Sequence, residues 1–244
     1  MHSALVSHQS PVLDVLVNGN FKESGDKCVK WESVDEDTFI RFWQFVYTGK
    51  YTAANPVVGP ERKSDTALEP PDSPPVVSGS PFGGFGGFGK EPKAEPPPKP
   101  PTKREAQWNE FKCSRSSTGL FSNFFGSSRE NLAREDYTNV FLSHARLYVF
   151  AECYGIAKLM EASLDQLHGI LTRFRLYKGR MKDIVMLVDY CYSNMVPEPL
   201  RKLVIRYTAC KVDKLWLSEE FQELVEAHGE LSRALIGSIL NRLD

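Results

Sequence analysis

Apolar side chains recur every three or four residues in two parts of this chain, a pattern that predicts helices with one buried face. The first such helix begins at Ser10 and Pro11, because serine caps free backbone amides and proline suits the first helical position. Asn18 and Gly19 end it, since both tolerate a positive φ angle. The pattern therefore predicts a short apolar helix between these two pairs of residues.

The segment after this helix changes its period. Polar and apolar residues alternate from Lys27 to Trp31, which predicts a short strand with one buried face. Asp35 then supplies a helix cap and an acidic first turn, and Gly49 ends the helix that follows. One face of that helix is expected to be buried, with a stripe of Phe39, Phe42, Trp43 and Val46.

Helical periodicity returns at Asp136 and continues almost to the last residue. Gly155 ends the first of these helices, and a basic break at Arg173–Lys182 ends the second. Three or four more helices follow, the first of them closed by Pro197 and Pro199. The apolar stripes are Phe141, Ala145, Tyr148 and Val149; Leu159, Ser163, Leu164, Leu167 and Leu171; Ile184, Leu187, Val188 and Cys191; Leu200, Leu203, Val204 and Tyr207; Phe221, Leu224 and Val225; and Leu231, Leu235, Ile236 and Ile239.

The composition between the two helical parts is different. Apart from Pro11, Pro197 and Pro199, all of the chain's 16 prolines lie between residues 56 and 101, together with the run FGGFGGFG. Such a stretch cannot bury enough apolar area to offset the entropy lost on ordering. Its C-terminal part is intermediate, because aromatic residues lie among serines and glycines. We therefore expect residues 52–136 to form a disordered Pro/Gly-rich insert.

The net charge of −1 gives no electrostatic case for direct binding to nucleic acid or to an anionic membrane. The five cysteines are odd in number and form no CxxC pair, so a disulfide framework is not expected. No apolar run approaches the roughly 20 residues that a spanning helix needs. The N-terminal residues lack the basic and apolar regions of a secretory signal. We expect a cytoplasmic or nuclear setting.

Several short motifs occur in an order that is specific when they are taken together. HSALVSHQSPV, the FKES turn, the DEDTF cap and YTGKY precede the insert, and FLSHARLYVFAECYG follows it. This set resembles a BTB/POZ domain of the fungal type, over residues 1–51 and about 137–172. The matching positions are His2, Leu5, Ser10, Pro11, Phe21, Glu23, Ser24, Asp35, Thr38, Phe39, Tyr47, Thr48, Gly49 and Tyr51.

The resemblance implies an α+β fold, a mostly helical BTB/POZ-like domain with a small sheet. Its two parts, 1–51 and 137–172, would be interrupted by the insert 52–136 and followed by an all-α C-terminal extension, 173–244. A surface loop after YTGKY can hold a long insertion because the entropy of loop closure grows only with the logarithm of length. Members of the family normally begin with a β-hairpin, so the chain is expected to be N-terminally truncated relative to the family.

The resemblance also implies a surface that binds partners. Phe21 and Glu23 lie where cullin adaptors of the family have a hydrophobic-x-Glu turn that contacts the cullin scaffold. An aromatic anchor beside a placed carboxylate suits a binding hot spot. The alternative is that Phe21 only packs beneath its helix. His2 is expected to be a structural residue with a satisfied hydrogen bond, and His144 to pack at the edge of its helix face.

Recognisable catalytic chemistry is missing from the sequence. The histidines and cysteines do not cluster at metal-ligand spacing, and there is no GxSxG, no phosphate-binding glycine loop and no HExxH. No catalytic residue, metal site or cofactor is therefore predicted. The Pro98–Lys103 stretch fits a polyproline ligand, but a stiff spacer is the simpler interpretation.

We therefore expect a protein–protein interaction module of the BTB/POZ type and not an enzyme. The first hypothesis is a substrate adaptor for a cullin-type ubiquitin ligase, which would act as a monomer or a homodimer. The alternatives are a scaffold or oligomerisation module without a ligase link, and a partner of a transcription regulator. The expected partners are other proteins, among them a cullin scaffold, with no direct contact to nucleic acid or membrane.

Overall fold

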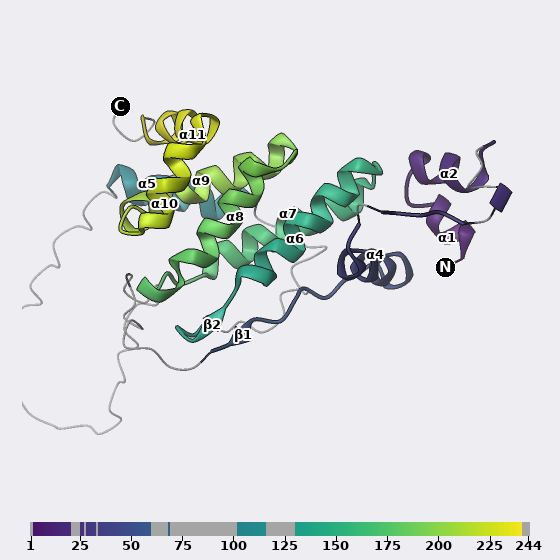
Figure 1. Cartoon of the computed structure of the whole chain (residues 1–244), viewed down its shortest axis with the longest axis horizontal. Coiled ribbons are helices and arrows are strands. Elements are labelled where there is room, and N and C mark those ends of the chain that lie inside the picture. Colours follow the sequence, from purple (N-terminus) through teal and green to yellow (C-terminus); the bar gives the residue numbers. More distant parts are fainter. Residues whose placement is uncertain are drawn as a thin grey trace, which may run out of the picture.

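The computed structural model describes residues 2–20, 25–26, 28–32, 34–59, 68, 102–115 and 130–240. Within these ranges the fold is mostly helical with one small two-stranded sheet, which agrees with the expected α+β class. The molecule is elongated (Figure 1), with the N-terminal helices at one end of its long axis and α11 at the other.

The described residues of the N-terminal part include three helices whose bounds are complete, and two of them begin where the sequence predicts. They are α1 (Ser3–Ser7), α2 (Pro11–Asn18) and α4 (Glu36–Thr48). The Ser10 hydroxyl accepts a hydrogen bond from the Leu13 amide, and the Asp35 carboxylate accepts one from the Thr38 amide. Gly49 ends α4 in the left-handed region at φ 68°, which a glycine adopts without strain.

The α4 stripe differs from the expected one at Trp43. Its side chain is 45% exposed, whereas Phe42, Phe45 and Val46 are buried. The buried face also includes Arg41, because α4 packs on α6 (Thr138–Cys153) through that side. Trp43 lies one helical step beyond this contact and therefore faces solvent.

The predicted strand at Lys27–Trp31 is wrong for Cys28–Trp31, where the backbone forms no ladder, and Lys27 lies outside the described residues. Trp31 instead inserts its indole among aromatic rings, with centroids 5.3 Å from Phe39 and 5.6 Å from Phe150. A strand needs a partner to satisfy its backbone groups, and none of the described segments pairs with this one in a sheet. The partly buried Trp31 ring packs against the smaller core instead.

The sheet forms elsewhere, between segments that the sequence did not mark as strands. β1 (Val57–Val58) pairs antiparallel with β2 (Glu135–Asp136), with Val57 opposite Asp136 and Val58 opposite Glu135. The Gly59 amide extends the ladder by donating to the Arg134 carbonyl at 2.8 Å. The two ends of the expected insert are therefore joined to each other.

The predicted C-terminal helices are all present. They are α6, α7 (Ala157–Arg173), α8 (Met181–Ser193), α9 (Glu198–Leu215), α10 (Glu219–Ala227) and α11 (Gly229–Leu240), with a 3₁₀ turn, η2, at Lys178–Arg180. Gly155 turns the chain between α6 and α7 at φ 64°. Pro197 and Pro199 belong to the start of α9 and not to the end of α8, because proline lacks only an amide that the first turn leaves free anyway.

Two hydrophobic cores share the helices α6 and α7. The larger core holds most of α7 with α8, α9 and the C-terminal helices, and the smaller one holds the N-terminal helices with the end of α6 and the start of α7. α6 contributes Phe141 and Tyr148 to the larger core and Leu147 and Phe150 to the smaller one. These side chains alternate along α6, so the two cores lie against different faces of this helix.

The expected disorder of residues 52–136 does not hold for all of the insert. α5 (Lys103–Cys113) begins with a capping box between Thr102 and Glu105, and it packs on α9. Phe111 is 1% exposed and lies between Tyr207 and His168, whose Nε2–H donates to the Phe111 carbonyl at 2.7 Å. Local capping and one buried aromatic side chain outweigh the polar composition of this segment.

Candidate functional site

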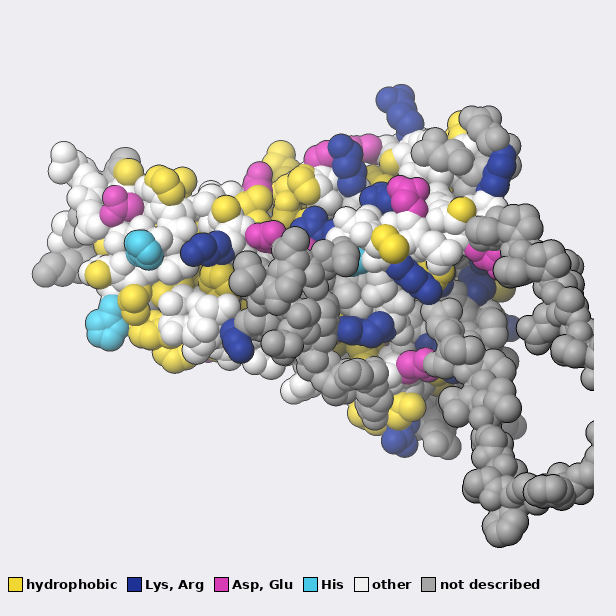
Figure 2. Space-filling view, turned by 180° about the vertical axis from the view of Figure 1, so that it is seen from behind, with side chains coloured by type: hydrophobic (Ala, Val, Ile, Leu, Met, Phe, Trp, Pro, Cys, Tyr) yellow, Lys and Arg dark blue, Asp and Glu magenta, His cyan; other side chains and the backbone are white. Residues whose placement is uncertain are grey.

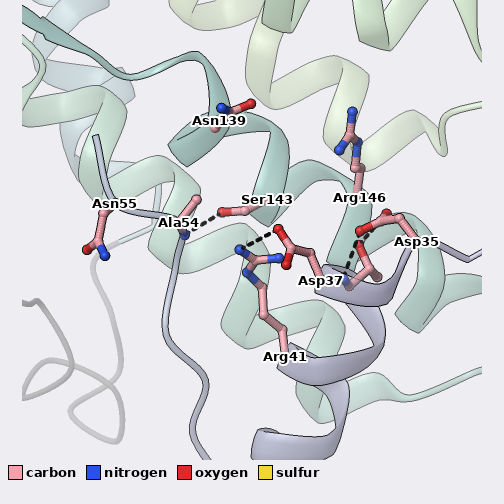
Figure 3. A pocket seen from close by; sticks show the side chains of 9 residues that line it. Asp35, Asp37, Arg41, Ala54, Asn55, Asn139, Ser143 and Arg146 are labelled. Carbon is pink, nitrogen blue, oxygen red and sulfur yellow. Dashed lines mark hydrogen bonds and ion pairs between the residues drawn. The ribbon is translucent and has the colours of Figure 1, made fainter. Parts of the chain in front are cut away.

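The predicted partner-binding residues, Phe21 and Glu23, lie outside the described residues. Their hypothesis therefore stays a prediction. The structure shows two other candidate features: an exposed apolar stripe on α4, and a polar pocket between α4 and α6 (Figure 3).

The apolar stripe consists of Ile40, Trp43 and Tyr47, which lie on one face of α4 at helical spacing and are 41%, 45% and 39% exposed. The rings of Trp43 and Tyr47 contact each other with centroids 5.1 Å apart. Figure 2 shows further hydrophobic side chains at the surface of the same end of the molecule. Single exposed apolar residues are common, but an ordered group with two aromatic rings is typical of a binding surface.

His2 is held against this stripe. Its backbone amide donates to the Tyr47 hydroxyl at 3.1 Å, and its Nδ1 lies 2.8 Å from the same oxygen. The expected structural role of His2 agrees with these contacts. The Tyr47 ring thereby connects the start of α1 to the end of α4.

The polar pocket has a volume of about 190 Å³ and is lined by three segments. α4 provides its first two turns, the extended chain after Gly49 provides Ala54 and Asn55, and α6 provides one face. The lining residues are Asp35, Asp37, Thr38, Arg41, Ala54, Asn55, Asn139, Ser143 and Arg146. Figure 3 shows the Arg41 guanidinium in the middle of this group.

Three of the lining side chains, those of Asp35, Thr38 and Ser143, are occupied by structural hydrogen bonds. Asp35 accepts from both the amide and the hydroxyl of Thr38, at 2.9 and 2.8 Å. Burial acts to raise the pKa of Asp35, but these hydrogen bonds and the Arg146 charge hold it below its ordinary value. The Ser143 hydroxyl accepts from the Ala54 amide at 3.2 Å and donates to the Val140 carbonyl.

Arg41 is buried to an unusual degree for a charged residue, since its side chain is 10% exposed. Its ion pair with Asp37 spans 3.7 Å, and the Asp37 side chain is 75% exposed. The Nε of Arg41 is buried and has no hydrogen-bond partner among the described residues. The positive charge is therefore only weakly compensated.

A buried hydrogen bond lies close to Arg41. Tyr51, the last residue of YTGKY, places its hydroxyl 2.6 Å from the Nδ1 of His144. His144 is fully buried, not at the edge of its helix face as the sequence suggested. Burial, with a smaller contribution from the Arg41 charge, lowers the pKa of His144 to about 3. The imidazole is therefore neutral near pH 7.

The pocket was not predicted because its members are spread over more than one hundred residues of sequence. A usable signal was nevertheless present at Arg41, which precedes Phe45 by four residues and so shares its face of the helix. A charged residue on the buried face of an amphipathic helix marks a polar site beneath it.

Two features are absent from the part of the chain that the structure describes. No group of three or more metal-ligating side chains lies together there. None of its helices is long and apolar enough to cross a membrane. The pocket is lined by carboxylates, hydroxyls, amides and arginines, and the α4 stripe is made of apolar side chains.

The chain was also compared with known proteins. No family model, no curated protein and no solved structure matches it.

Proposed function

We propose that this chain is a protein–protein interaction module of the BTB/POZ type and acts as a substrate adaptor for a cullin-type ubiquitin ligase. The order of its motifs, from the HSALVSHQSPV start to the YTGKY exit, supports the family. The fold class and the helix caps at Ser10 and Asp35 are compatible with it.

The observation that carries an interaction function is the α4 stripe of Ile40, Trp43 and Tyr47. An exposed tryptophan beside a tyrosine provides a large, rigid contact area at a low cost in side-chain entropy. Aromatic residues of this kind are enriched in interfaces and carry much of their binding energy. A partner that covers the stripe would remove apolar area from water without refolding the chain.

In the adaptor function, Phe21 and Glu23 contact the scaffold, and the exposed α4 stripe offers a further contact surface. The aromatic side chain anchors the contact, and the carboxylate selects a basic or amide group opposite it. Substrates would be taken elsewhere on the chain, by the insert or the C-terminal helices.

The test is capture of a purified cullin by the immobilised full chain at physiological salt. Phe21→Ala combined with Glu23→Lys is expected to abolish capture, and Trp43→Ala to weaken it about tenfold or more, as hot-spot residues do. Trp216→Ala is the matched control, because Trp216 is 48% exposed and lies at the end of α9, away from the N-terminal helices. It should leave capture unchanged.

The scaffold alternative gives a different result in the same set of proteins. If the wild-type chain captures no cullin, the adaptor function is wrong. Sedimentation at increasing concentration would then show whether the chain associates with itself. Loss of that association in Trp43→Ala, but not in Trp216→Ala, would favour an oligomerisation module.

A further inference from the structure

In the polar pocket between α4 and α6, the hydrogen-bond donors outnumber the acceptors that are available to them. The Asp35 carboxylate is engaged by Thr38, and Asp37 reaches Arg41 only at 3.7 Å. The side chains of Asn55, Asn139 and Arg146 form no hydrogen bond or ion pair with other described residues. All three residues are exposed, so their donors are open to water and to a ligand at the mouth of the hollow.

Arg41 is the strongest indication of a missing partner. Burying a charge costs several kcal/mol unless a close counter-charge and hydrogen bonds compensate it. Arg41 is nine-tenths buried, yet its Nε has no acceptor and its nearest carboxylate is mostly in solvent. The structure therefore maintains a buried guanidinium whose charge is incompletely paired. Arg41 is among the residues that line the pocket (Figure 3), although its Nε itself is closed to solvent.

The chemistry of the missing group follows from the lining. Guanidinium groups bind carboxylates and phosphates through two parallel hydrogen bonds, so an anion is the natural ligand. Asp35 and Asp37 also line the pocket, and they repel a doubly charged phosphate more strongly than a singly charged carboxylate. The mixed lining therefore favours a carboxylate.

The size of the pocket limits the ligand further. Its volume of about 190 Å³ lies below the range of about 300–1,000 Å³ that is typical for drug-sized ligands and cofactors. One acidic side chain of a protein fits this scale, and a nucleotide does not.

We propose that the pocket is a binding site for a carboxylate from an acidic segment of a partner protein, with Arg41 as its main ligand and Arg146 as the second. Asn55 and Asn139 donate to the same group from the two walls of the pocket. The inference deepens the proposed interaction function and rests on it for the source of the carboxylate.

The test uses a hexaglutamate peptide as the probe and hexaglutamine as its uncharged counterpart, both titrated into the full chain at 0.15 M salt. This ionic strength screens exposed charges over about 8 Å and so suppresses diffuse attraction. The affinity comes from calorimetry, and the contact comes from the NMR signal of the arginine Nε–H groups. We expect hexaglutamate alone to bind and to shift the Arg41 signal.

Three variants locate the site. Arg146→Gln removes an exposed charge and should weaken hexaglutamate binding about tenfold, the effect of one charge-assisted hydrogen bond. Arg233→Gln removes an exposed charge on α11 and should leave the affinity unchanged. Arg41→Lys keeps the charge but loses the planar fork, so it should also weaken binding. If Arg41→Lys does not fold, the affinity of Arg146→Gln and the NMR signal of Arg41 in the wild-type chain still test the proposal.

Several results would overturn the inference. They are equal binding of the two peptides, an unshifted Arg41 signal, and equal affinities for Arg146→Gln and Arg233→Gln. Displacement of hexaglutamate by inorganic phosphate at a lower concentration would assign the pocket to phosphate instead. The titration contains no cullin and no second partner, so failed cullin capture and failed peptide binding refer to different proposals.

Discussion

The hydroxyl of Tyr51 lies 2.6 Å from the Nδ1 of His144, and both side chains are buried. Tyr51 follows the last turn of α4, whereas His144 lies in the middle of α6. The contact therefore fixes the point at which the chain leaves the N-terminal helices. It also gives a structural reason for the tyrosine at the end of YTGKY.

Replacing Tyr51 by phenylalanine should lower the free energy of unfolding by about 1–3 kcal/mol, because it leaves the buried Nδ1 of His144 without a partner. Urea denaturation followed by circular dichroism measures this loss. Tyr47→Phe is the matched control, since it removes an exposed hydroxyl that contacts His2. Equal losses of unfolding free energy in the two variants would show that the buried hydrogen bond stabilises the fold no more than the exposed one.

The His144 imidazole should make stability depend on pH. Burial lowers its pKa to about 3 in the folded chain, against the ordinary 6.5. Below pH 6.5 the unfolded chain therefore binds a proton at this imidazole, whereas the folded chain binds it only when the pH falls to about 3. This contribution to stability is complete above pH 6.5 and falls as the pH decreases, by up to about 1.4 kcal/mol per unit.

His144→Asn removes this titration while retaining a polar group near Tyr51. Its unfolding free energy is lower at neutral pH, but the difference from the wild type should shrink between pH 6.5 and pH 4. A difference that stays constant over this range would contradict the buried neutral histidine. The measurement is a series of urea denaturation curves at fixed ionic strength.

Asp183 should produce the opposite dependence. Burial, assisted by the nearby Asp136 charge, raises the pKa of Asp183 to about 7, although the Tyr137 amide donates to it and Arg180 lies nearby. The folded chain keeps a proton that the unfolded chain releases above pH 3.8. This contribution to stability is complete below pH 3.8 and is lost as the pH rises to about 7.

Asp183→Asn keeps the acceptor for the Tyr137 amide and cannot ionise. Its unfolding free energy relative to the wild type should increase from pH 4 to pH 7 and then level off. Asp14→Asn makes the same substitution at an exposed position of α2 and gives the reference profile. A profile of Asp183→Asn that runs parallel to that reference would contradict the raised pKa.

Phe111 should decide whether α5 belongs to the cooperative fold. Phe111→Ala removes a fully buried ring between Tyr207 and His168, and a cost of about 3–5 kcal/mol is expected if α5 unfolds with the rest. Thr102→Ala removes only the capping box, so its cost should be about 1 kcal/mol. Both values come from urea denaturation monitored by circular dichroism.

A different outcome is informative for the same helix. If Phe111→Ala changes tryptophan fluorescence but leaves the denaturation midpoint unchanged, α5 undocks by itself. Trp108 reports on this event, because its ring stacks on Phe111 and the Lys211 ammonium lies 3.8 Å from its centroid. The expected result is a shift of the midpoint together with the fluorescence change.

Local rules predicted the helices well. Caps such as Ser10, Asp35 and Gly49 act within one turn of the chain, so their effect can be read from neighbouring residues. The apolar stripes of α6 to α11 likewise repeat at the helical period and needed no knowledge of distant segments. Where these local signals agree with burial, the expected elements are confirmed.

Distant contacts explain what could not be predicted. β1 and β2 are two residues each and exist only because Val57 and Asp136 meet across the insert. Trp31 ends a segment with the alternation of a strand, yet its ring packs in the aromatic cluster around Phe150. The polar pocket has the same origin, since Arg41 and Arg146 are distant in sequence and become neighbours only when α4 packs on α6.

The two faces of α6 suggest how the polypeptide could be divided. Residues 2–59 contact the remainder mainly through the smaller core and the β1–β2 pair. In both contacts, the residues that they meet come after residue 130 in the sequence. A fragment that ends near residue 59 and another that begins near residue 102 would therefore carry complementary surfaces. Mixed in solution, the two pieces should reassemble without a covalent connection, and they would meet on α6 and the start of α7.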